Sequence, residues 1–212
     1  MKLKKILALM LSCLTLMLVL TSCGKSDKSS EEGKNKEDMI EKSFTVTLYP
    51  EHAPITCENF EKLVSEKFYD GLIFHRVVEG FMAQGGDPEG TGRGGAPETI
   101  KGEFKGNGVD NTLSHKRGVI SMARSTENDS ASSQFFICYN DVSSSLDGSY
   151  AAFGEVTDGM DVVDEFLKVE RSVNSMGEIA IPIIDITIKK AEMIDDDADG
   201  NPRVKFTMNY KY

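Results

Sequence analysis

The chain has 212 residues, the size of one domain with short appendages. Asp and Glu number 34 against 24 Lys and Arg, and the resulting charge of −10 argues against nucleic acid as a partner, because phosphates call for a basic surface. Hydrophobic residues make up 40% of the chain, which excludes a wholly disordered protein.

The first 22 residues have the pattern of an export signal. Lys2, Lys4 and Lys5 form a positive start and are followed by residues 6–20, which carry no charge. An uncharged run of this length fits the ~7–15 residues of a signal-peptide core better than the ~20 residues of a transmembrane helix. We therefore interpret residues 1–22 as a signal peptide that is removed on export.

A short motif ends this segment. Its letters, Leu20-Thr21-Ser22-Cys23, resemble a bacterial lipobox, in which the cysteine sulfur receives a diacylglyceryl group. We expect Cys23 to be lipidated and to anchor the chain at the extracytoplasmic face of the cell membrane. An ordinary cleavage site with an incidental cysteine is the alternative. Residues 23–42 are rich in charge and cannot bury enough apolar surface to fold, so we expect a flexible tether there.

The rest of the chain carries short strand patterns and two helical patterns. Residues 43–49 alternate apolar and polar side chains, which predicts a half-buried strand. Apolar residues at helical spacing predict a helix over residues 57–68, with Thr56 as its N-cap. Further strands are predicted over residues 72–78, 81–84, 118–123, 134–139, 150–156, 181–190 and 203–212, and a second helix over residues 158–167. This order favours an antiparallel β structure, closed or partly closed.

The cysteines and histidines give no support for metal or hydrolytic chemistry. Beyond the lipobox only Cys57 and Cys138 remain, and neither has a Cys-x-x-Cys partner. Two buried free thiols are favoured over a disulfide between them. The three histidines form no His-Glu-x-x-His pair, and a Gly-x-Ser-x-Gly elbow is missing, so neither a zinc protease nor a serine hydrolase is indicated.

Two weaker motifs have simpler explanations. Residues 90–95 match the dinucleotide-binding pattern by letter, but Pro97 follows and a long helix does not, so we interpret them as a mobile loop at a rim. Residues 195–200 resemble the first half of a calcium loop, but Phe206 stands where a bidentate glutamate is required. We interpret this segment as an acidic turn before the last strand.

Three separated blocks carry the strongest signal. They read FHRVVEGFMAQGGD at residues 74–87, GVISMA and SQFFI at residues 118–123 and 133–137, and LDGSYAAFG at residues 146–154. In this order they resemble the cyclophilin family of peptidyl-prolyl cis–trans isomerases, and the resemblance covers residues 43–194. It implies a closed eight-stranded antiparallel β-barrel capped by two helices. Residues 195–212 would follow as an acidic turn and a C-terminal strand or tail.

The resemblance also implies an active face. Its catalytic residues would be Arg76, Phe81 and Gln84. Its substrate-binding residues would be Met82, Ala123, Arg124, Gln134, Phe136, Leu146 and Tyr150. His75 is not part of the family's active face, so we interpret it as a structural residue. The chain departs from common family patterns at Arg124, Ser145 and Tyr150, where asparagine, tryptophan and histidine are frequent.

The expected reaction explains this choice of residues. Rotation about an amide bond has a barrier of ~18–20 kcal/mol but breaks no bond, so we expect neither a metal nor a cofactor. Arg76 would direct a charged donor at the proline nitrogen, and apolar side chains would form a cup for the proline ring. Gln84 would position Arg76 and bind the peptide backbone, with Gln134 as a further polar contact.

The predicted protein is therefore a monomeric folding catalyst for exported chains. Its partners would be unfolded or partly folded exported proteins and proline-containing peptides. The alternative, from another functional class, is a membrane-tethered binding module or holdase that docks proline segments with little turnover. Exchange between the cis and trans forms of a proline peptide, measured by NMR, separates the two.

Overall fold

The computed structural model describes residues 39–212. The predicted signal peptide, the lipidation site at Cys23 and most of the predicted tether lie outside the described residues. Within residues 39–212, none of the helices has the length and apolar composition needed to cross a bilayer.

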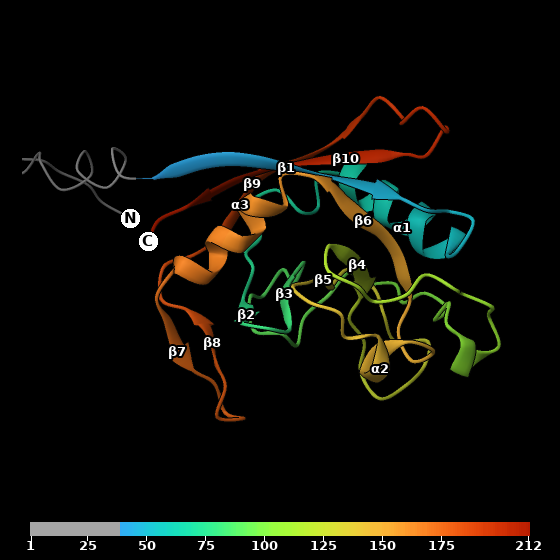
Figure 1. The fold of residues 1–212 in the computed structure, drawn as a ribbon, viewed down its shortest axis with the longest axis horizontal. Coiled ribbons are helices and arrows are strands. Elements are labelled where there is room, and N and C mark those ends of the chain that lie inside the picture. The colour runs from blue at the N-terminus through green and yellow to red at the C-terminus, as the bar shows by residue number, and fades with distance from the viewer. Residues whose placement is uncertain (1–38) are drawn as a thin grey trace, which may run out of the picture.

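One curled antiparallel sheet organises the described chain (Figure 1). Its strands are β1 (Ile40–Leu48), β2 (Arg76–Val78), β3 (Met82–Gly85), β4 (Val119–Met122), β5 (Phe135–Cys138), β6 (Ala152–Asp158), β9 (Thr187–Ile194) and β10 (Arg203–Tyr210). They are hydrogen-bonded in the order β2-β3-β5-β4-β6-β1-β10-β9. A separate hairpin, β7 (Arg171–Val173) and β8 (Ile179–Pro182), lies beside β2.

Short helices connect strands of the curled sheet and pack against it. They are α1 (Pro54–Ser65), α2 (Ser143–Leu146) and α3 (Met160–Glu165), with short 3-10 turns η1 (Lys105–Asn107) and η2 (Phe166–Lys168). The two predicted helices correspond to α1 and to α3 with η2, each shorter or shifted by a few residues. The short helix α2 has no counterpart among the predicted elements.

The sheet is a half-barrel, so the predicted closed barrel is wrong. Its edge strands β2 and β9 do not form a ladder with each other. Residues 72–74 approach β9 instead: the Phe74 N–H donates to the Ile186 carbonyl at 2.9 Å, and the Ile188 N–H donates to Leu72 at 2.8 Å. The predicted strand over residues 72–78 is thus divided between two neighbours, and only its last three residues pair with β3.

The two ends of the described chain belong to the same sheet. Strand β1 begins at Ile40, so the last residues of the predicted tether are part of the fold. Strand β10 lies between β1 and β9 and pairs with both, from Arg203 to Tyr210. A boundary at residue 194 therefore does not separate a folded domain from a tail, because the last strand completes the sheet.

Helix α1 is capped from a distance. Thr56 is not its N-cap, because the helix begins at Pro54 and Ala53 takes that position. The Glu103 carboxylate accepts hydrogen bonds from the Ile55 and Thr56 N–H groups at 3.1 and 2.7 Å. A negative charge at this end satisfies free backbone donors and suits the helix dipole.

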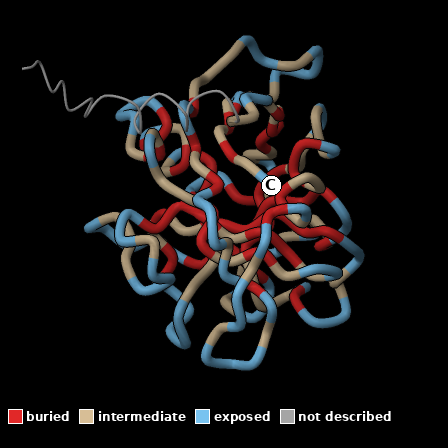
Figure 2. Tube along the Cα trace, turned by 90° about the vertical axis from the view of Figure 1, so that its left-hand side faces the viewer, coloured by how far each residue is buried: buried red, intermediate tan, exposed pale blue. Residues whose placement is uncertain are grey.

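The main core combines aliphatic side chains with a cluster of aromatic rings, and Figure 2 shows buried residues in the centre of the molecule and exposed residues in the outer loops. The Phe60 ring of α1 lies 5.0 Å from Phe153 and 5.5 Å from Phe135, measured between centroids. Cys57 and Cys138 are both free and buried, which confirms the prediction. Burial raises the pKa of each thiol to about 12, so neither is a reactive thiolate at neutral pH.

We expect Glu165→Gln to lower the free energy of unfolding at pH 7 by about 1 kcal/mol. The Glu165 carboxylate accepts from the Tyr210 hydroxyl at 2.6 Å and pairs with Lys42 at 2.9 Å, joining α3 to β10 and β1. These two partners lower its pKa from 4.5 to about 2. Because the folded pKa is the lower one, this stability is complete above pH 4.5 and is lost as the pH falls toward 2.

Urea unfolding at pH 7 and near pH 2 tests this expectation. The variant and the native chain should differ at pH 7 and converge near pH 2. Glu192→Gln is the matched control, since its ion pair with Lys190 is exposed and should contribute little. An equal effect of the two substitutions at pH 7 would contradict the assigned role of Glu165.

Candidate active site

Three neighbouring strands bring the predicted site residues to one face. In the β2–β3 ladder Arg76 lies directly opposite Gln84, and in the β3–β5 ladder Gln84 lies opposite Phe136. Residues directly opposite in antiparallel strands point to the same side of the sheet. The turn between β2 and β3 therefore aligns Arg76 and Gln84, which alternation along the chain alone does not establish.

A second apolar cluster lies on this outer face, apart from the main core. Its buried members are Met82, Phe136, Cys138 and Leu146, and Phe81, Ala123 and Tyr150 pack against them. We call Phe81, Met82, Phe136 and Leu146 the cup. The cup opens into a cavity of about 870 Å³, which Arg76 and Gln84 also line. All of the predicted site residues except Gln134 line this cavity.

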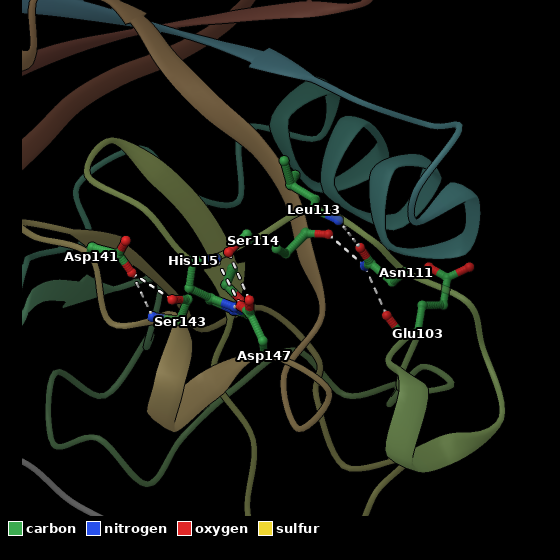
Figure 3. Close-up of polar contacts among 10 residues, drawn as sticks. Glu103, Asn111, Leu113, Ser114, His115, Asp141, Ser143 and Asp147 are labelled. Atoms are coloured by element: carbon green, nitrogen blue, oxygen red, sulfur yellow. Dashed lines mark hydrogen bonds and ion pairs between the residues drawn. The ribbon is translucent and has the colours of Figure 1, made fainter.

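The floor of the cup rests on a buried histidine. The His115 ring stacks on Phe136 at 6.1 Å between centroids, and its Nε2 lies 2.9 Å from the Ser121 hydroxyl. Its Nδ1 lies 2.7 Å from the Asp147 carboxylate, and Figure 3 shows these two side chains facing each other. Burial lowers the pKa of His115 although Asp147 opposes the shift. A neutral, hydrogen-bonded ring thus fixes the orientation of Phe136.

The guanidinium of Arg76 is held by a residue that the sequence did not indicate. Its Nε and Nη2 donate to the Glu178 carboxylate at 3.1 and 2.8 Å. Its Nη1 lies 3.8 Å from the Met82 sulfur, and its central carbon lies 5.6 Å from the centre of the Phe81 ring. The charged group is therefore fixed at the rim of the cup, between an ion pair and apolar side chains.

Gln84 does not hold Arg76, contrary to the prediction. Its amide nitrogen donates to the Gln134 side-chain oxygen at 2.8 Å, and the Gln134 amide donates to the Gly94 carbonyl at 2.7 Å. Gln134 lines a smaller cavity of about 360 Å³ next to the cup, together with Gln84 and Ala123. Two amides in series thus connect the cup to residues 90–95, which we call the glycine-rich loop.

Arg124 and Tyr150 form the opposite rim. The Arg124 guanidinium lies over the Tyr150 ring at 4.9 Å and over the Phe104 ring at 5.0 Å. Its Nε donates to the Ser149 carbonyl at 3.0 Å. Tyr150 contacts Phe136 edge to face at 5.9 Å. Arg124 and Tyr150, two of the three positions at which the chain departs from the family pattern, therefore support each other and the cup.

The glycine-rich loop is anchored, so its interpretation as a mobile rim is corrected. The Asp87 carboxylate accepts backbone hydrogen bonds from Glu89, Thr91, Gly92 and Arg93 at distances between 2.6 and 3.1 Å. These bonds lower the pKa of Asp87 although its burial opposes the shift. The cavity wall formed by residues 90–93 is thereby held in place.

His75 lies against Gly92 of this wall and also lines the cavity, so its interpretation as a structural residue stays a prediction. It is 9% exposed, and neither ring nitrogen has a hydrogen-bond partner. Burial lowers its pKa, so the ring is neutral at physiological pH.

Among residues 39–212, no three His, Cys, Asp or Glu side chains are grouped so that they could hold a metal ion. At residues 195–201 the Asp197 carboxylate accepts the Asp199 and Asn201 N–H groups within the turn between β9 and β10.

Comparison with known proteins agrees with this geometry. The profile of the family described as "Cyclophilin type peptidyl-prolyl cis-trans isomerase/CLD" matches residues 35–193. Peptidyl-prolyl cis-trans isomerase B of Bacillus subtilis is 46% identical over 134 residues, which cover 63% of this chain and 87% of that protein. An isomerase of Arabidopsis thaliana is 39% identical over 168 residues, which cover 77% of this chain and 97% of the relative.

A solved structure supports the same assignment. The crystal structure of a cyclophilin-type isomerase from Cryptosporidium parvum, determined in the presence of the dipeptide Ala-Pro, superposes with a TM-score of 0.59 at 30% identity. The match covers 71% of this chain and 95% of that one. The half-barrel, the outer-face cup and these matches together establish that the chain belongs to the cyclophilin-type peptidyl-prolyl cis–trans isomerases.

Proposed function

We propose that this isomerase accelerates the folding of exported proteins, with Arg76 assisting rotation of the X-Pro amide from the rim of the cup. The observation that carries the proposal is the placement of Arg76. Its guanidinium is the cation beside Phe81 and Met82, and its Nη1 lies on the side of the Met82 sulfur.

The chemistry follows from the electronic structure of the amide. A planar X-Pro amide delocalises the nitrogen lone pair into the carbonyl, and twisting the bond returns that lone pair to nitrogen. A fixed N–H donor at the nitrogen therefore stabilises the twisted state more than the planar one, which is the requirement for catalysis. The Arg76 guanidinium carries five N–H donors and no acceptor, so it can present a donor to this nitrogen.

The cup would hold the proline ring while the amide rotates. Met82, Phe136 and Leu146 are buried and present apolar surface to the cavity. Filling that space with a pyrrolidine ring displaces water from beside the guanidinium, which strengthens its interaction with the developing lone pair. The reaction then requires no covalent intermediate.

The neighbouring amides suit the peptide on one side of the proline. The Gln84 nitrogen is engaged by Gln134, which leaves its carbonyl oxygen to accept an N–H from an extended substrate. The adjoining 360 Å³ cavity would receive the side chain that precedes the proline. Contacts to backbone and to proline alone would permit many different clients.

The predicted signal peptide indicates that the substrates of this isomerase would be other exported proteins. A chain that carries a lipobox would reside where proteins emerge unfolded from the translocation machinery. Uncatalysed proline isomerisation takes tens to hundreds of seconds, long enough to expose such chains to proteolysis and aggregation. An anchored monomer beside the exit would shorten that period.

The experiment measures turnover and breadth together. Cis–trans exchange is followed by NMR for proline peptides that vary in the preceding residue, and refolding is followed for a protein limited by proline isomerisation. We expect acceleration of every peptide and of the refolding. Binding without faster exchange would favour the holdase, and turnover of only one peptide would favour a dedicated receptor.

The anchor is tested separately in a bacterial host. We expect Cys23→Ser to leave the chain unprocessed or to release it from the membrane fraction, because the acylated sulfur is lost. Membrane fractionation and labelling with a radioactive fatty acid measure both results, with Cys57→Ser as the control thiol substitution. Fatty acid that still attaches to the Cys23→Ser chain would exclude the lipobox.

A further inference from the structure

The β7–β8 hairpin places the Glu178 carboxylate beside the Arg76 guanidinium. Glu178 lies in the turn of this hairpin, 102 residues from Arg76 in sequence, and accepts hydrogen bonds from both Nε and Nη2. This side-by-side arrangement is the strong, directional form of an arginine–carboxylate pair. It leaves the third guanidinium nitrogen, Nη1, on the side of Met82.

The turn is built around the position of Glu178. The Asn174 side-chain nitrogen donates to the Glu178 carboxylate at 2.7 Å. Its side-chain oxygen accepts the N–H groups of Met176 and Glu178 at 2.9 and 3.0 Å. Gly177 takes a φ of 83°, which favours glycine and lets the chain reverse within the turn. One asparagine therefore closes the turn and orients the carboxylate.

The hairpin is in turn fixed to the strand that carries Arg76. At its base the Arg171 guanidinium donates to the carbonyls of Val77 and Leu167, each at 3.1 Å. Val77 is the residue after Arg76 on β2. The distance between the hairpin and the Arg76 backbone is thus set by hydrogen bonds at both ends of the hairpin.

Glu178 approaches from outside the cavity. Arg76 belongs to the cavity lining, and so do Asn174 and Met176 of the turn, but Glu178 does not. The ion pair therefore leaves the cup open. Hydrogen bonds from Asn174 and Arg76 lower the pKa of Glu178, so the carboxylate is charged at neutral pH.

We infer that Glu178 is a positioning residue for isomerisation, which holds the Arg76 guanidinium so that Nη1 faces the proline nitrogen in the cup. This inference rests on the proposed role of Arg76. Without the carboxylate, the guanidinium is free to swing about its side-chain torsions, and the donor is present but wrongly placed for much of the time. Misplacement by about 1 Å is enough to cost a large part of a catalytic rate.

The test compares three single variants of the full-length chain by NMR exchange with a proline peptide. We expect Glu178→Ala to lower kcat by about tenfold with KM almost unchanged, since the residue does not touch the cavity. Glu178→Gln keeps one acceptor and should recover part of the loss. Glu170→Ala removes an exposed carboxylate at the base of the same hairpin and should leave kcat unchanged.

A double-variant cycle shows whether Glu178 acts through Arg76. In an Arg76→Ala background, Glu178→Ala should produce no further loss. An equal loss in both backgrounds would assign Glu178 a purely structural role and overturn the inference. A rise in activity on Glu178→Ala would overturn it too, since the carboxylate would then restrain Arg76.

Failure of the two proposals can be told apart. A fully active Arg76→Ala chain removes the proposed mechanism itself. An inactive Arg76→Ala chain with unaffected Glu178→Ala removes the positioning role alone. Thermal unfolding of each variant identifies one that fails to fold, and the Glu178→Gln result in that case decides the question, because its side chain has the same shape.

Discussion

Arg76→Ala is expected to lower kcat/KM for a proline peptide by at least about 100-fold, comparable to the loss of one oxyanion-hole donor. Arg76 is half-buried at the rim of an apolar cup, and its Nη1 is the guanidinium nitrogen that Glu178 leaves unoccupied. A donor at the prolyl nitrogen acts only as the amide twists, so its loss should appear in kcat rather than in KM.

Two variants sharpen the measurement. Arg76→Lys keeps the charge but loses the planar guanidinium that pairs with Glu178 through two nitrogens, so its activity should be little higher than that of Arg76→Ala. Arg203→Ala removes an arginine on β10, away from the cup, whose Nε donates to the Asp195 carbonyl, and the activity of this variant should match that of the native chain. A folded Arg76→Ala chain with full activity, or full recovery in Arg76→Lys, would contradict the mechanism.

The positions of strands such as β4 and β5 along the chain were predictable because each depends on a local pattern. The strand predicted over residues 181–190 is instead divided between β8 and β9, and β7 was not predicted. The strands over residues 118–123 and 134–139 were placed within one or two residues of β4 and β5, since both are apolar runs. Closure of the barrel was not predictable in the same way. It requires one continuous strand over residues 72–78 that pairs with both β3 and β9, and nothing in that run shows that it divides after residue 74.

The site, too, contains residues that the sequence predicted and residues that it did not. The cup residues lie in contiguous blocks, and the β2–β3 turn brings Arg76 opposite Gln84. Four carboxylates support the site and its surroundings, in roles that the sequence did not indicate: Asp87, Glu103, Asp147 and Glu178. Glu103 and Glu178 act on residues 47 and 102 positions away, and a single acidic residue in a loop has no periodicity to reveal such a partner.

Two adjacent phenylalanines of strand β5 lie on opposite faces of the sheet, one in the main core and one in the cup. Phe135 points into the main core, where its ring lies within 6 Å of Phe60, Tyr69, Phe74 and Phe206, and Phe136 points into the cup. Phenylalanine, the same residue type, thus occurs on both faces of one strand. A pair of identical substitutions therefore measures what each face contributes.

Phe135→Ala should lower the free energy of unfolding by about 3–5 kcal/mol, the usual cost of deleting a buried phenylalanine. Phe136→Ala should cost less stability because its ring borders an open cavity, but it should lower kcat/KM by about 10–100-fold, equivalent to about 1.5–3 kcal/mol of apolar contact with the proline ring. Urea unfolding and NMR exchange, measured on both variants at a temperature where each is folded, give the comparison. If Phe135→Ala lost activity while folded, or if Phe136→Ala kept it, the outer cup would not be where proline binds.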